Sequence, residues 1–421
     1  MFKKISKCRI CSNKKLTKII DLNNQFLQGS FIKKNTPTPY KKKIPLKLAL
    51  CQKCSLVQLL HTTDKETLYK NYWYESGINL TMRLHLNNLV KEICTILNIK
   101  KENEISVLDI GCNDGTLLNF YPKKFKKYGI DPSQITNKID KNSINVIRDF
   151  FPPKKTKRLK SKFDIITSIA MFYDLDNPNL FVKKIKYHLK KHGIWIFELS
   201  YLIDMLKLNS FDTICHEHLE YYSLHSLDYL MKKHKLKIFN ISKNSINGGS
   251  IRCFVTHIDN PLYDNKKNKD FYESLLSYEK KIRINEKNIY LKFNTKINNL
   301  KKQLMRKISQ IKKNNKKLFI LGASTKGNTI LQFMGINDKI IPYAIERNKE
   351  KIGAKTIGSN IKIISEKSVI NNQPDYKLVL PWHFMSEIVK RETNYIKSGG
   401  KLIFPLPKIL EVNKKNFKNY A

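Results

Sequence analysis

The fold of the central part of the chain is decided by the segment Ile105-Ser106-Val107-Leu108-Asp109-Ile110-Gly111-Cys112-Asn113-Asp114-Gly115-Thr116-Leu117-Leu118. The run from Ile105 to Ile110 is mostly apolar and β-branched, which is typical of a strand covered on both faces of a sheet. Gly111 and Gly115 then bracket a turn in which the backbone can come close to a ligand, because neither residue has a side chain. The segment therefore predicts a buried strand, a tight glycine turn and the start of a helix.

An acidic residue follows this turn at the spacing that is typical of nucleotide-binding sheets. Asp131 comes twenty residues after Gly111, where its carboxylate can accept hydrogen bonds from ribose hydroxyls. Position 113 is Asn, so the pattern is not Gly-x-Gly-x-x-Gly; it resembles the form found in class I S-adenosylmethionine (SAM) methyltransferases. That resemblance implies SAM as the cofactor, held at Asp109, Gly111, Asn113, Gly115 and Asp131. The alternative is a glycine turn in another α/β protein.

Length and composition bound the class of protein. A chain of 421 residues predicts two or three domains, and 41% hydrophobic residues are enough to build their cores. No apolar run reaches the roughly 18 residues of a transmembrane helix, and the start of the chain lacks the apolar region of a secretory signal. We therefore expect a cytoplasmic protein with reduced thiols.

The charge of the chain is strongly positive. Lys and Arg number 79 against 35 Asp and Glu, a net charge of +44, which by itself suggests nucleic acid or a membrane surface as partner. The lysines are spread over every segment instead of one tail or stripe, which favours a compositional bias. We expect no specific nucleic-acid partner and no membrane partner, although an anionic substrate such as a nucleotide would benefit from the field.

Two Cys-x-x-Cys pairs lie near the start of the chain. Cys8 with Cys11 and Cys51 with Cys54 supply four thiolates that can close a tetrahedral zinc site, while the other cysteines are scattered. Such a site has no open coordination position, so the zinc would be structural. Disulfides are the alternative, which a cytoplasmic location disfavours. Residues 1–70 are predicted to form this zinc-binding module.

Strands and helices alternate along residues 71–260. A helix is predicted over 81–96, and strands over 144–147, 163–168 and 193–198, with a helix over 181–189. This alternation predicts a parallel sheet with helices on both faces and a ligand at the carboxyl ends of the strands. Asp149, after the third strand, is a further cofactor candidate that could meet the adenine of SAM; a surface aspartate is equally plausible.

The segment 211–223 concentrates residues that can transfer protons. It contains His216, Glu217, His218 and Tyr222, and histidine is the side chain suited to take protons near neutral pH. If the segment is extended, His216 and His218 share one face and Glu217 points away. Metal chelation by the two histidines and a helix start with exposed polar residues are the alternatives. Tyr74, in an aromatic connector, is a further catalytic candidate, although such connectors are usually packing elements.

A second α/β unit ends the chain. A lysine-rich helical connector over 268–317 leads into Gly322-x-x-x-x-Gly327-Asn328-Thr329, which follows an apolar strand. The lysine that a phosphate-binding P-loop needs after its second glycine is absent, so a P-loop nucleotidase is disfavoured. Further strands are predicted over 340–346, 377–380 and 401–404. Residues 261–421 are thus predicted to be a helical connector and a C-terminal Rossmann-like domain.

Several of these segments together resemble the three-domain sugar C-methyltransferases, a family that contains the NDP-hexose 3-C-methyltransferases of deoxysugar pathways. The resemblance rests on both Cys-x-x-Cys pairs, Tyr74-x-Ser76-Gly77-Ile78-Asn79, 108–115, Asp212-Thr213-Ile214-Cys215-His216-Glu217-His218, Gly248-Gly249-Ser250-Ile251-Arg252, Gly322-Ala323-x-x-Lys326-Gly327 and Leu380-Pro381-Trp382. Two positions depart from the family pattern, which has Tyr at position 215 and a His near position 173.

The resemblance implies a fold and a chemistry. The fold is α/β, with a small N-terminal zinc module, a central class I SAM domain and a C-terminal Rossmann-like domain that helps to hold a nucleotide-sugar. The implied reaction removes a proton beside the keto group of a nucleotide-linked deoxysugar and transfers the SAM methyl group to that carbon. The resemblance favours His218 as the base, with Glu217 and His216 orienting it or the substrate. Methyl transfer to RNA or to a different small metabolite, and a catalytically silent SAM-binding scaffold, are the competing hypotheses.

Overall fold

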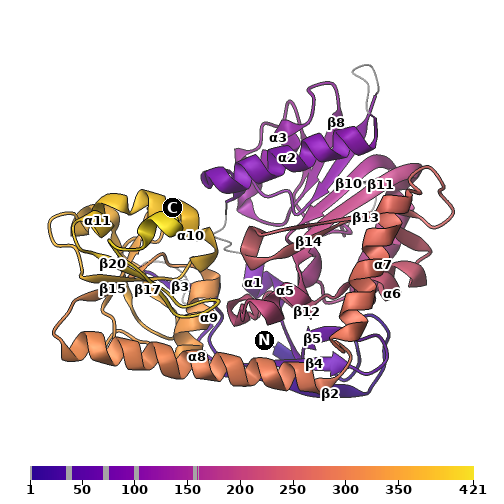
Figure 1. Cartoon of the computed structure of the whole chain (residues 1–421). Coiled ribbons are helices and arrows are strands. Elements are labelled where there is room, and N and C mark those ends of the chain that lie inside the picture. Colours follow the sequence, from indigo (N-terminus) through magenta and orange to yellow (C-terminus); the bar gives the residue numbers. More distant parts are fainter. Residues whose placement is uncertain (1, 35–39, 70–74, 99–103, 155–158, 160) are drawn as a thin grey trace.

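The computed structural model describes residues 2–34, 40–69, 75–98, 104–154, 159 and 161–421 (Figure 1). Tyr74, one of the predicted catalytic residues, lies outside the described residues. Three sheets of four or more strands form the framework of the molecule. The long helix α8 (Lys287–Lys313) runs along one side, from the region of the N-terminal strands to the C-terminal sheet.

The central sheet has seven strands in the order β13-β14-β11-β10-β7-β8-β9. The first five along the chain pair in parallel, β14 is antiparallel to β11, and β13 is antiparallel to β14. The order reverses between β7 and β10, and ligands of doubly wound sheets bind beside the carboxyl ends of the strands at such a reversal. The strands are β7 (Ser106–Ile110), β8 (Lys126–Ile130), β9 (Asn145–Ile147), β10 (Phe163–Ile169), β11 (Leu189–Ser200), β13 (Leu236–Asn244) and β14 (Ser250–His257).

Helices cover both faces of this sheet. Asn79 caps the start of α2 (Leu80–Ile96) by accepting hydrogen bonds from the N–H groups of Thr81 and Met82, and the helix buries its apolar stripe against β7. The helix predicted over 81–96 is therefore confirmed. The other helices of this part are α3 (Thr116–Phe120), α4 (Pro178–His188), α5 (Leu202–Lys207) and α6 (Leu224–Lys233).

The N-terminal strands share sheets with both later parts of the chain. A four-stranded sheet has the order β12-β5-β4-β2, and its strand β12 (Glu220–Tyr221) comes from the segment that follows His218. The short strand β3 (Phe31–Ile32) extends the C-terminal sheet instead. The remaining N-terminal elements are β1 (Phe2–Lys4), β2 (Leu16–Gln25), β4 (Ile44–Cys51), β5 (Val57–Leu59), β6 (His61–Thr63) and α1 (Lys65–Tyr69).

The C-terminal sheet has the order β21-β20-β19-β15-β16-β18-β17-β3. It begins after α7 (Lys266–Lys281) and α8, whose apolar residues pack into one core with this sheet and with β2. The strands are β15 (Leu318–Leu321), β16 (Tyr343–Glu346), β17 (Lys355–Thr356), β18 (Lys362–Ser365), β19 (Tyr376–Val379), β20 (Lys401–Phe404) and β21 (Leu410–Val412). The helices are α9 (Thr325–Met334), α10 (Met385–Arg391) and α11 (Thr393–Lys397).

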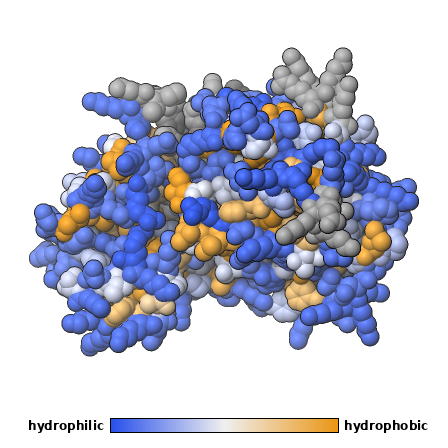
Figure 2. Space-filling view, turned by 90° about the horizontal axis from the view of Figure 1, so that it is seen from above, coloured by the Kyte–Doolittle hydropathy of each residue, from blue (hydrophilic) through white to orange (hydrophobic). Residues whose placement is uncertain are grey.

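The surface is dominated by hydrophilic residues, with small apolar areas between them on the face that Figure 2 shows. Among the described helices, none combines the length with the apolar character that crossing a membrane requires. The α/β architecture predicted from the sequence, with two Rossmann-like sheets and an N-terminal cysteine module, is confirmed.

Candidate active site and metal centre

The glycine turn after β7 has the conformation that the sequence predicts. Gly111 and Gly115 have φ angles of 75° and 76°, in the left-handed region that favours glycine. The N–H of Gly111 donates to the carbonyl oxygen of Ile130 at 2.8 Å, which holds the turn against the end of β8. A Cβ atom at position 111 would lie 3.0 Å from the side chain of Met171. The turn therefore leaves little room for a side chain at position 111.

Two carboxylates flank this turn. Asp131 accepts the Asn113 N–H at 3.0 Å through Oδ2, and the Ser133 N–H at 2.8 Å and hydroxyl at 2.5 Å through Oδ1. A carboxylate has about four lone-pair positions, so Asp131 keeps capacity for a ribose hydroxyl. Asp109, at the end of β7, accepts the Thr167 hydroxyl at 2.6 Å, and burial raises its pKa to about 7. Five of the six predicted cofactor residues thus lie together.

Asp149, the sixth cofactor candidate, lies beyond β9 in a local turn. Its carboxylate accepts the N–H groups of Phe150 at 2.8 Å and Lys154 at 2.9 Å, and the residue is only half-buried. These hydrogen bonds to nearby backbone N–H groups explain the orientation of the Asp149 carboxylate. A role toward adenine stays a prediction.

Asp114 is a residue that sequence reasoning missed. Its Oδ2 accepts the Gly77 N–H at 2.7 Å, and the side chain of Asn113 accepts the Ser76 N–H at 3.0 Å. These bonds fasten the segment before α2 onto the cofactor turn. A Cβ atom at Gly77 would lie 2.8 Å from Oδ2 of Asp114, so a larger residue here would require the Asp114 side chain to shift. The motif quoted around Ser76 and Gly77 contained the signal, but its partner is distant in the sequence.

We expect the substitution Asp131→Ala to weaken SAM binding by about 10- to 100-fold, because charged hydrogen bonds contribute roughly 1.5–3 kcal/mol. Asp131→Asn keeps one acceptor oxygen and should lose less. Calorimetric titration with SAM measures both affinities, and Asp140→Ala, at an exposed aspartate of the same region, serves as the control. Unchanged affinity in Asp131→Ala would exclude the ribose contact.

The four N-terminal cysteines form a compact cluster. Their sulfur atoms all lie within 4.8 Å of one another, with 3.5 Å between Cys8 and Cys54 and 3.4 Å between Cys11 and Cys51. Tetrahedral zinc with Zn–S bonds of 2.3 Å separates its ligand sulfurs by about 3.8 Å, which these thiols fit. All four are free, so the disulfide alternative is wrong. With four sulfur ligands, the zinc would tie the chain together and leave no position for substrate.

His218 lies in an irregular loop between the 3₁₀ turn η5 (Phe211–Thr213) and β12. Its Nδ1 lies 2.7 Å from the carbonyl oxygen of Thr213. A carbonyl can only accept, so Nδ1 carries the proton and Nε2 keeps its lone pair. The ring of Tyr173 lies edge-on to the imidazole at 4.4 Å. Burial and the charge of Lys326 hold the pKa of His218 at about 3, so the ring is neutral at pH 7.

The expectation that residues 216–218 form an extended strand, with His216 and His218 on one face, is wrong, because these residues lie in an irregular loop. His216 is buried, with Nδ1 2.7 Å from Oε1 of Gln28 and Nε2 3.2 Å from the carbonyl oxygen of Ile44. Burial lowers its pKa to about 4. Both ring nitrogens of His216 therefore lie against oxygen atoms of the N-terminal module, one in a turn and one in β4, and the residue anchors the loop.

Glu217 is buried as well and lies against the backbone of the N-terminal module. A Cβ atom at Gly29 would come within 2.1 Å of its Oε1. Its Oε2 is a buried oxygen without a hydrogen-bond partner among the described residues, and burial raises the pKa of the carboxyl group. Such an oxygen can serve a polar group of a ligand.

Tyr222 lies in the hydrophobic core and not among these polar groups. Its ring stacks on Phe172, with centroids 5.4 Å apart and the planes 3° from parallel. Burial and the charge of Glu220 both raise the pKa of Tyr222. Glu220 lies in β12, the strand that pairs with β5. We therefore do not keep Tyr222 among the catalytic candidates.

The C-terminal domain contributes residues that sequence reasoning left without a role. Trp382, in the 3₁₀ turn η8 (Trp382–Phe384), donates its Nε1–H to Oδ2 of the buried Asp212 at 2.9 Å. Lys326, in the first turn of α9, donates to the carbonyl oxygen of Asn247 at 2.6 Å. A Cβ atom at Gly248 would lie 3.1 Å from the Trp382 ring. The glycine motif before β14 is thus where the two domains meet.

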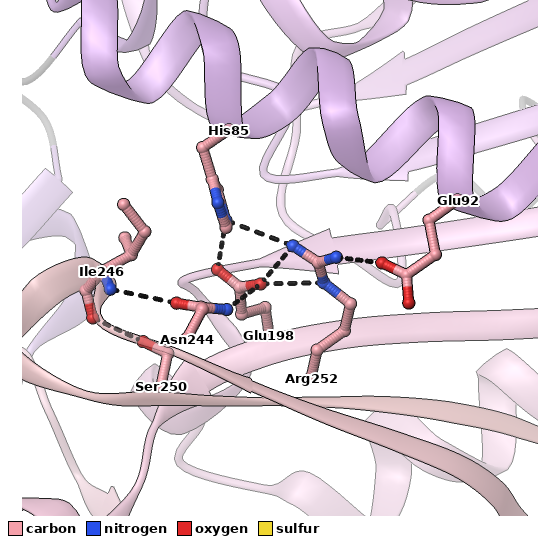
Figure 3. A network of polar contacts seen from close by, with 7 residues as sticks. All are labelled: His85, Glu92, Glu198, Asn244, Ile246, Ser250 and Arg252. Carbon is pink, nitrogen blue, oxygen red and sulfur yellow. Dashed lines mark hydrogen bonds and ion pairs between the residues drawn. The ribbon is translucent and has the colours of Figure 1, made fainter.

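A buried ion network holds α2 on the central sheet (Figure 3). Glu198 on β11 contacts His85 Nε2 at 2.6 Å, Asn244 Nδ2 at 2.9 Å and Arg252 Nε at 2.9 Å. Arg252 also pairs with Glu92. Burial would raise the pKa of Glu198, but the His85 hydrogen bond and the Arg252 charge outweigh it and lower the pKa. The arginine of the Gly-Gly-Ser-x-Arg segment therefore positions the helix whose start docks on the cofactor turn.

Three family models match the chain in succession. Residues 8–69 match a model described as "Putative zinc binding domain", residues 82–240 a "Methyltransferase domain", and residues 245–407 a "C-methyltransferase C-terminal domain". The C-methyltransferase NovU from Streptomyces niveus is 24% identical over 408 residues, which cover 96% of each chain. A tRNA U34 carboxymethyltransferase from Campylobacter jejuni is 31% identical, but over only 24% of this chain and 38% of its own length.

Solved structures give a weaker likeness. A SAM-dependent methyltransferase from Clostridium acetobutylicum ATCC 824 is 14% identical and covers 42% of this chain and 92% of its own, with a TM-score of 0.34. The magnesium protoporphyrin IX methyltransferase ChlM from Synechocystis PCC 6803 is 11% identical and covers 44% and 90%, also with a TM-score of 0.34. At these TM-scores neither structure adds to the assignment.

The doubly wound sheet, its glycine turn and the matching domain define a SAM-dependent methyltransferase with an N-terminal four-cysteine zinc site. With the C-terminal domain that follows, the chain is similar along 96% of its length to the C-methyltransferase NovU. The cofactors predicted from the sequence, SAM and structural zinc, are confirmed.

Proposed function

We propose that this enzyme transfers the SAM methyl group to a carbon atom beside the keto group of a nucleotide-linked deoxysugar. The observation that carries the proposal is the state of His218, whose Nδ1 is fixed by the Thr213 carbonyl and whose Nε2 keeps a lone pair. A neutral imidazole held in one tautomer can take a proton, and a carbon acid beside a carbonyl is the substrate type that needs such a base.

In the proposed mechanism the acceptor binds with its C–H bond directed at Nε2 of His218. The C–H bond breaks, the proton moves to Nε2, and the electron pair moves onto the carbonyl oxygen as the enolate. SAM supplies an electrophilic methyl group to the enolate carbon when it is bound at the glycine turn. The residues of the chain hold the two reactants in line and exclude water, and the Thr213 carbonyl hydrogen-bonds to the imidazolium that forms.

The nucleotide-sugar part of the proposal is supported by two arguments. The motifs around His218, Gly248 and Lys326 resemble those of sugar C-methyltransferases, and the C-terminal domain belongs to a C-methyltransferase family. Lysines are abundant over the chain, and a net charge of +44 favours an anionic acceptor such as a nucleoside diphosphate derivative. Cys215 and Tyr173, where the sugar enzymes differ, lie next to or against His218.

The proposal is tested with labelled SAM and a panel of acceptors. We expect methyl transfer to at least one NDP-4-keto-deoxysugar, and none to the corresponding sugar reduced at the keto carbon, which lacks the acidic C–H bond. An RNA panel at physiological salt supplies the competing acceptor. Methylation of RNA with no methylation of any keto sugar would replace the proposal with the RNA hypothesis, and SAM binding without transfer to any acceptor would favour a scaffold.

We further propose the domain division 1–70, 71–260 and 261–421, which the ranges of the three family models support. A cytoplasmic location belongs to the same proposal, because thiolate ligands of zinc must stay reduced. Separation of cell extracts into cytoplasmic and membrane fractions, followed by immunodetection, would test the location.

A further inference from the structure

Lys326 lies on a helix of the C-terminal domain that contacts the segment before His218, because the Thr329 hydroxyl of the same helix donates to the carbonyl oxygen of Ile214 at 3.4 Å. It lies in the first turn of α9, and its ammonium donates at 2.6 Å to the carbonyl oxygen of Asn247, directly before the Gly248-Gly249 pair. Its charge acts on groups from several segments of the chain. It adds to the effect of burial in lowering the pKa of His218 and of His383, and it opposes the effect of burial on the pKa of Asp212.

Buried polar atoms without partners lie on both sides of the domain boundary that Lys326 crosses. Oδ1 of Asp212, Oε2 of Glu217 and Nδ1 of His383 have no hydrogen-bond partner among the described residues. Asp212 lies in η5, directly before the loop that carries His218, and Glu217 lies in that loop. A buried polar atom without a partner is costly, so a cluster of them indicates a place for the polar groups of a ligand. The lysine and these atoms together form a polar site at the domain boundary.

We propose that the Lys326 ammonium stabilises the negative charge on the carbonyl oxygen of the acceptor when His218 takes the neighbouring proton. The inference rests on the proposed function. An ammonium group has three N–H donors, and the bond to Asn247 uses one of them. The remaining donors can hydrogen-bond to the enolate oxygen. Burial lowers the pKa of Lys326, and the charge of Asp212, whose Oδ2 is held by Trp382, opposes that shift and favours the ammonium form.

A hydrogen bond that only links the two domains does not explain why residue 326 carries a positive charge. The bond to the Asn247 carbonyl needs one N–H donor, which a neutral amide also supplies. The positive charge of Lys326 makes His218 a weaker base, because it disfavours the imidazolium. The charge of Lys326 near His218 therefore lowers stability and, without an anion nearby, also hinders proton uptake by His218. It becomes favourable when an anion forms between the two groups, because fixed charges stabilise an anion strongly in a buried site.

The experiment measures exchange of the acceptor C–H for deuterium in D₂O, with S-adenosylhomocysteine bound so that no methyl transfer follows. The variants are Lys326→Met, Lys326→Gln, which keeps a donor for Asn247 but has no charge, and Lys326→Arg. Lys301→Met is the matched control. Lys301 lies on α8 and also donates to a backbone carbonyl oxygen, that of Phe333 near the end of α9, at 2.7 Å. SAM affinity and melting temperature are measured for every variant.

We expect the variants Lys326→Met and Lys326→Gln to exchange the acceptor proton about 10²- to 10³-fold more slowly, the usual effect of losing one hydrogen-bond donor to an oxyanion. Arg should restore part of the rate, and Lys301→Met should exchange like the wild type. Loss of the positive charge should raise the pKa of His218, so the acid limb of the rate profile should move to higher pH in Lys326→Gln. Wild-type exchange in Lys326→Gln, with no shift of that limb, would overturn the inference.

The inference and the function on which it rests fail in different ways. If the wild type exchanges no proton of any keto sugar, the proposed function is wrong. If the wild type exchanges and Lys326→Gln does so equally fast, only the role of Lys326 is wrong. If Lys326→Met does not fold, the Gln and Arg variants still separate the charge from the hydrogen bond.

Discussion

The substitution His218→Asn should lower acceptor C–H exchange and methyl transfer by on the order of 10²-fold or more, the scale of a lost general base. Asparagine can still donate one hydrogen bond toward the Thr213 carbonyl but has no nitrogen that can take a proton at neutral pH. SAM affinity should stay nearly unchanged, because the contacts of His218 with the Thr213 carbonyl and the Tyr173 ring involve no predicted cofactor residue. Deuterium exchange of the acceptor and calorimetry with SAM measure the two quantities separately.

His188 provides the matched control for this substitution. It is also a buried histidine whose Nδ1 lies against a backbone carbonyl, that of Ser161 at 3.1 Å, but it lies at the end of α4. His188→Asn should therefore exchange the acceptor proton at the wild-type rate. If His218→Asn also exchanges at that rate, His218 is not the base, and Glu217 with its unpaired Oε2 becomes the next candidate. His216 is a poor substitute, because both of its ring nitrogens are engaged.

Loss of the zinc site should have the largest effect on folding. Structural zinc contributes apparent free energies of about 10–16 kcal/mol in small peptides, which exceeds or equals the stability of a typical domain. Cys51→Ser should reduce the zinc content from one ion per chain to near zero and should lower the melting temperature substantially. Metal analysis of protein purified without added zinc and thermal unfolding followed by circular dichroism measure both effects.

The zinc site should also affect catalysis through the loop that carries His218. Strand β12 follows that loop and pairs with β5, the Leu59 N–H donates to the carbonyl oxygen of Leu219 at 2.9 Å, and Gln28 contacts His216. In Cys51→Ser we therefore expect acceptor exchange to fall more than SAM affinity, because the cofactor turn lies on another sheet. Cys94→Ser, on α2 outside the cluster, is the control and should retain its zinc. Unchanged zinc content in Cys51→Ser would contradict the site.

Local patterns in the sequence determined much of the fold. The apolar run before Gly111 and the two glycines predict the strand, turn and helix start because backbone conformation and burial are properties of that segment itself. The Cys-x-x-Cys pairs predict zinc because two short spacings already bring four thiolates into two chelating pairs. The helix over 81–96 is predicted closely for the same reason, since its apolar periodicity is a property of that segment.

The tertiary structure alone decided how the candidate site is built. The tautomer of His218, the anchoring of His216 and the burial of Tyr222 depend on Thr213, Gln28 and Phe172, whose positions follow from the packing of whole elements. The same holds for two residues of the C-terminal domain. Lys326 contacts Asn247, and Trp382 contacts Asp212, which lies 170 residues earlier in the chain. Contacts between distant segments depend on how sheets and helices pack, which the periodicity of a single segment does not contain.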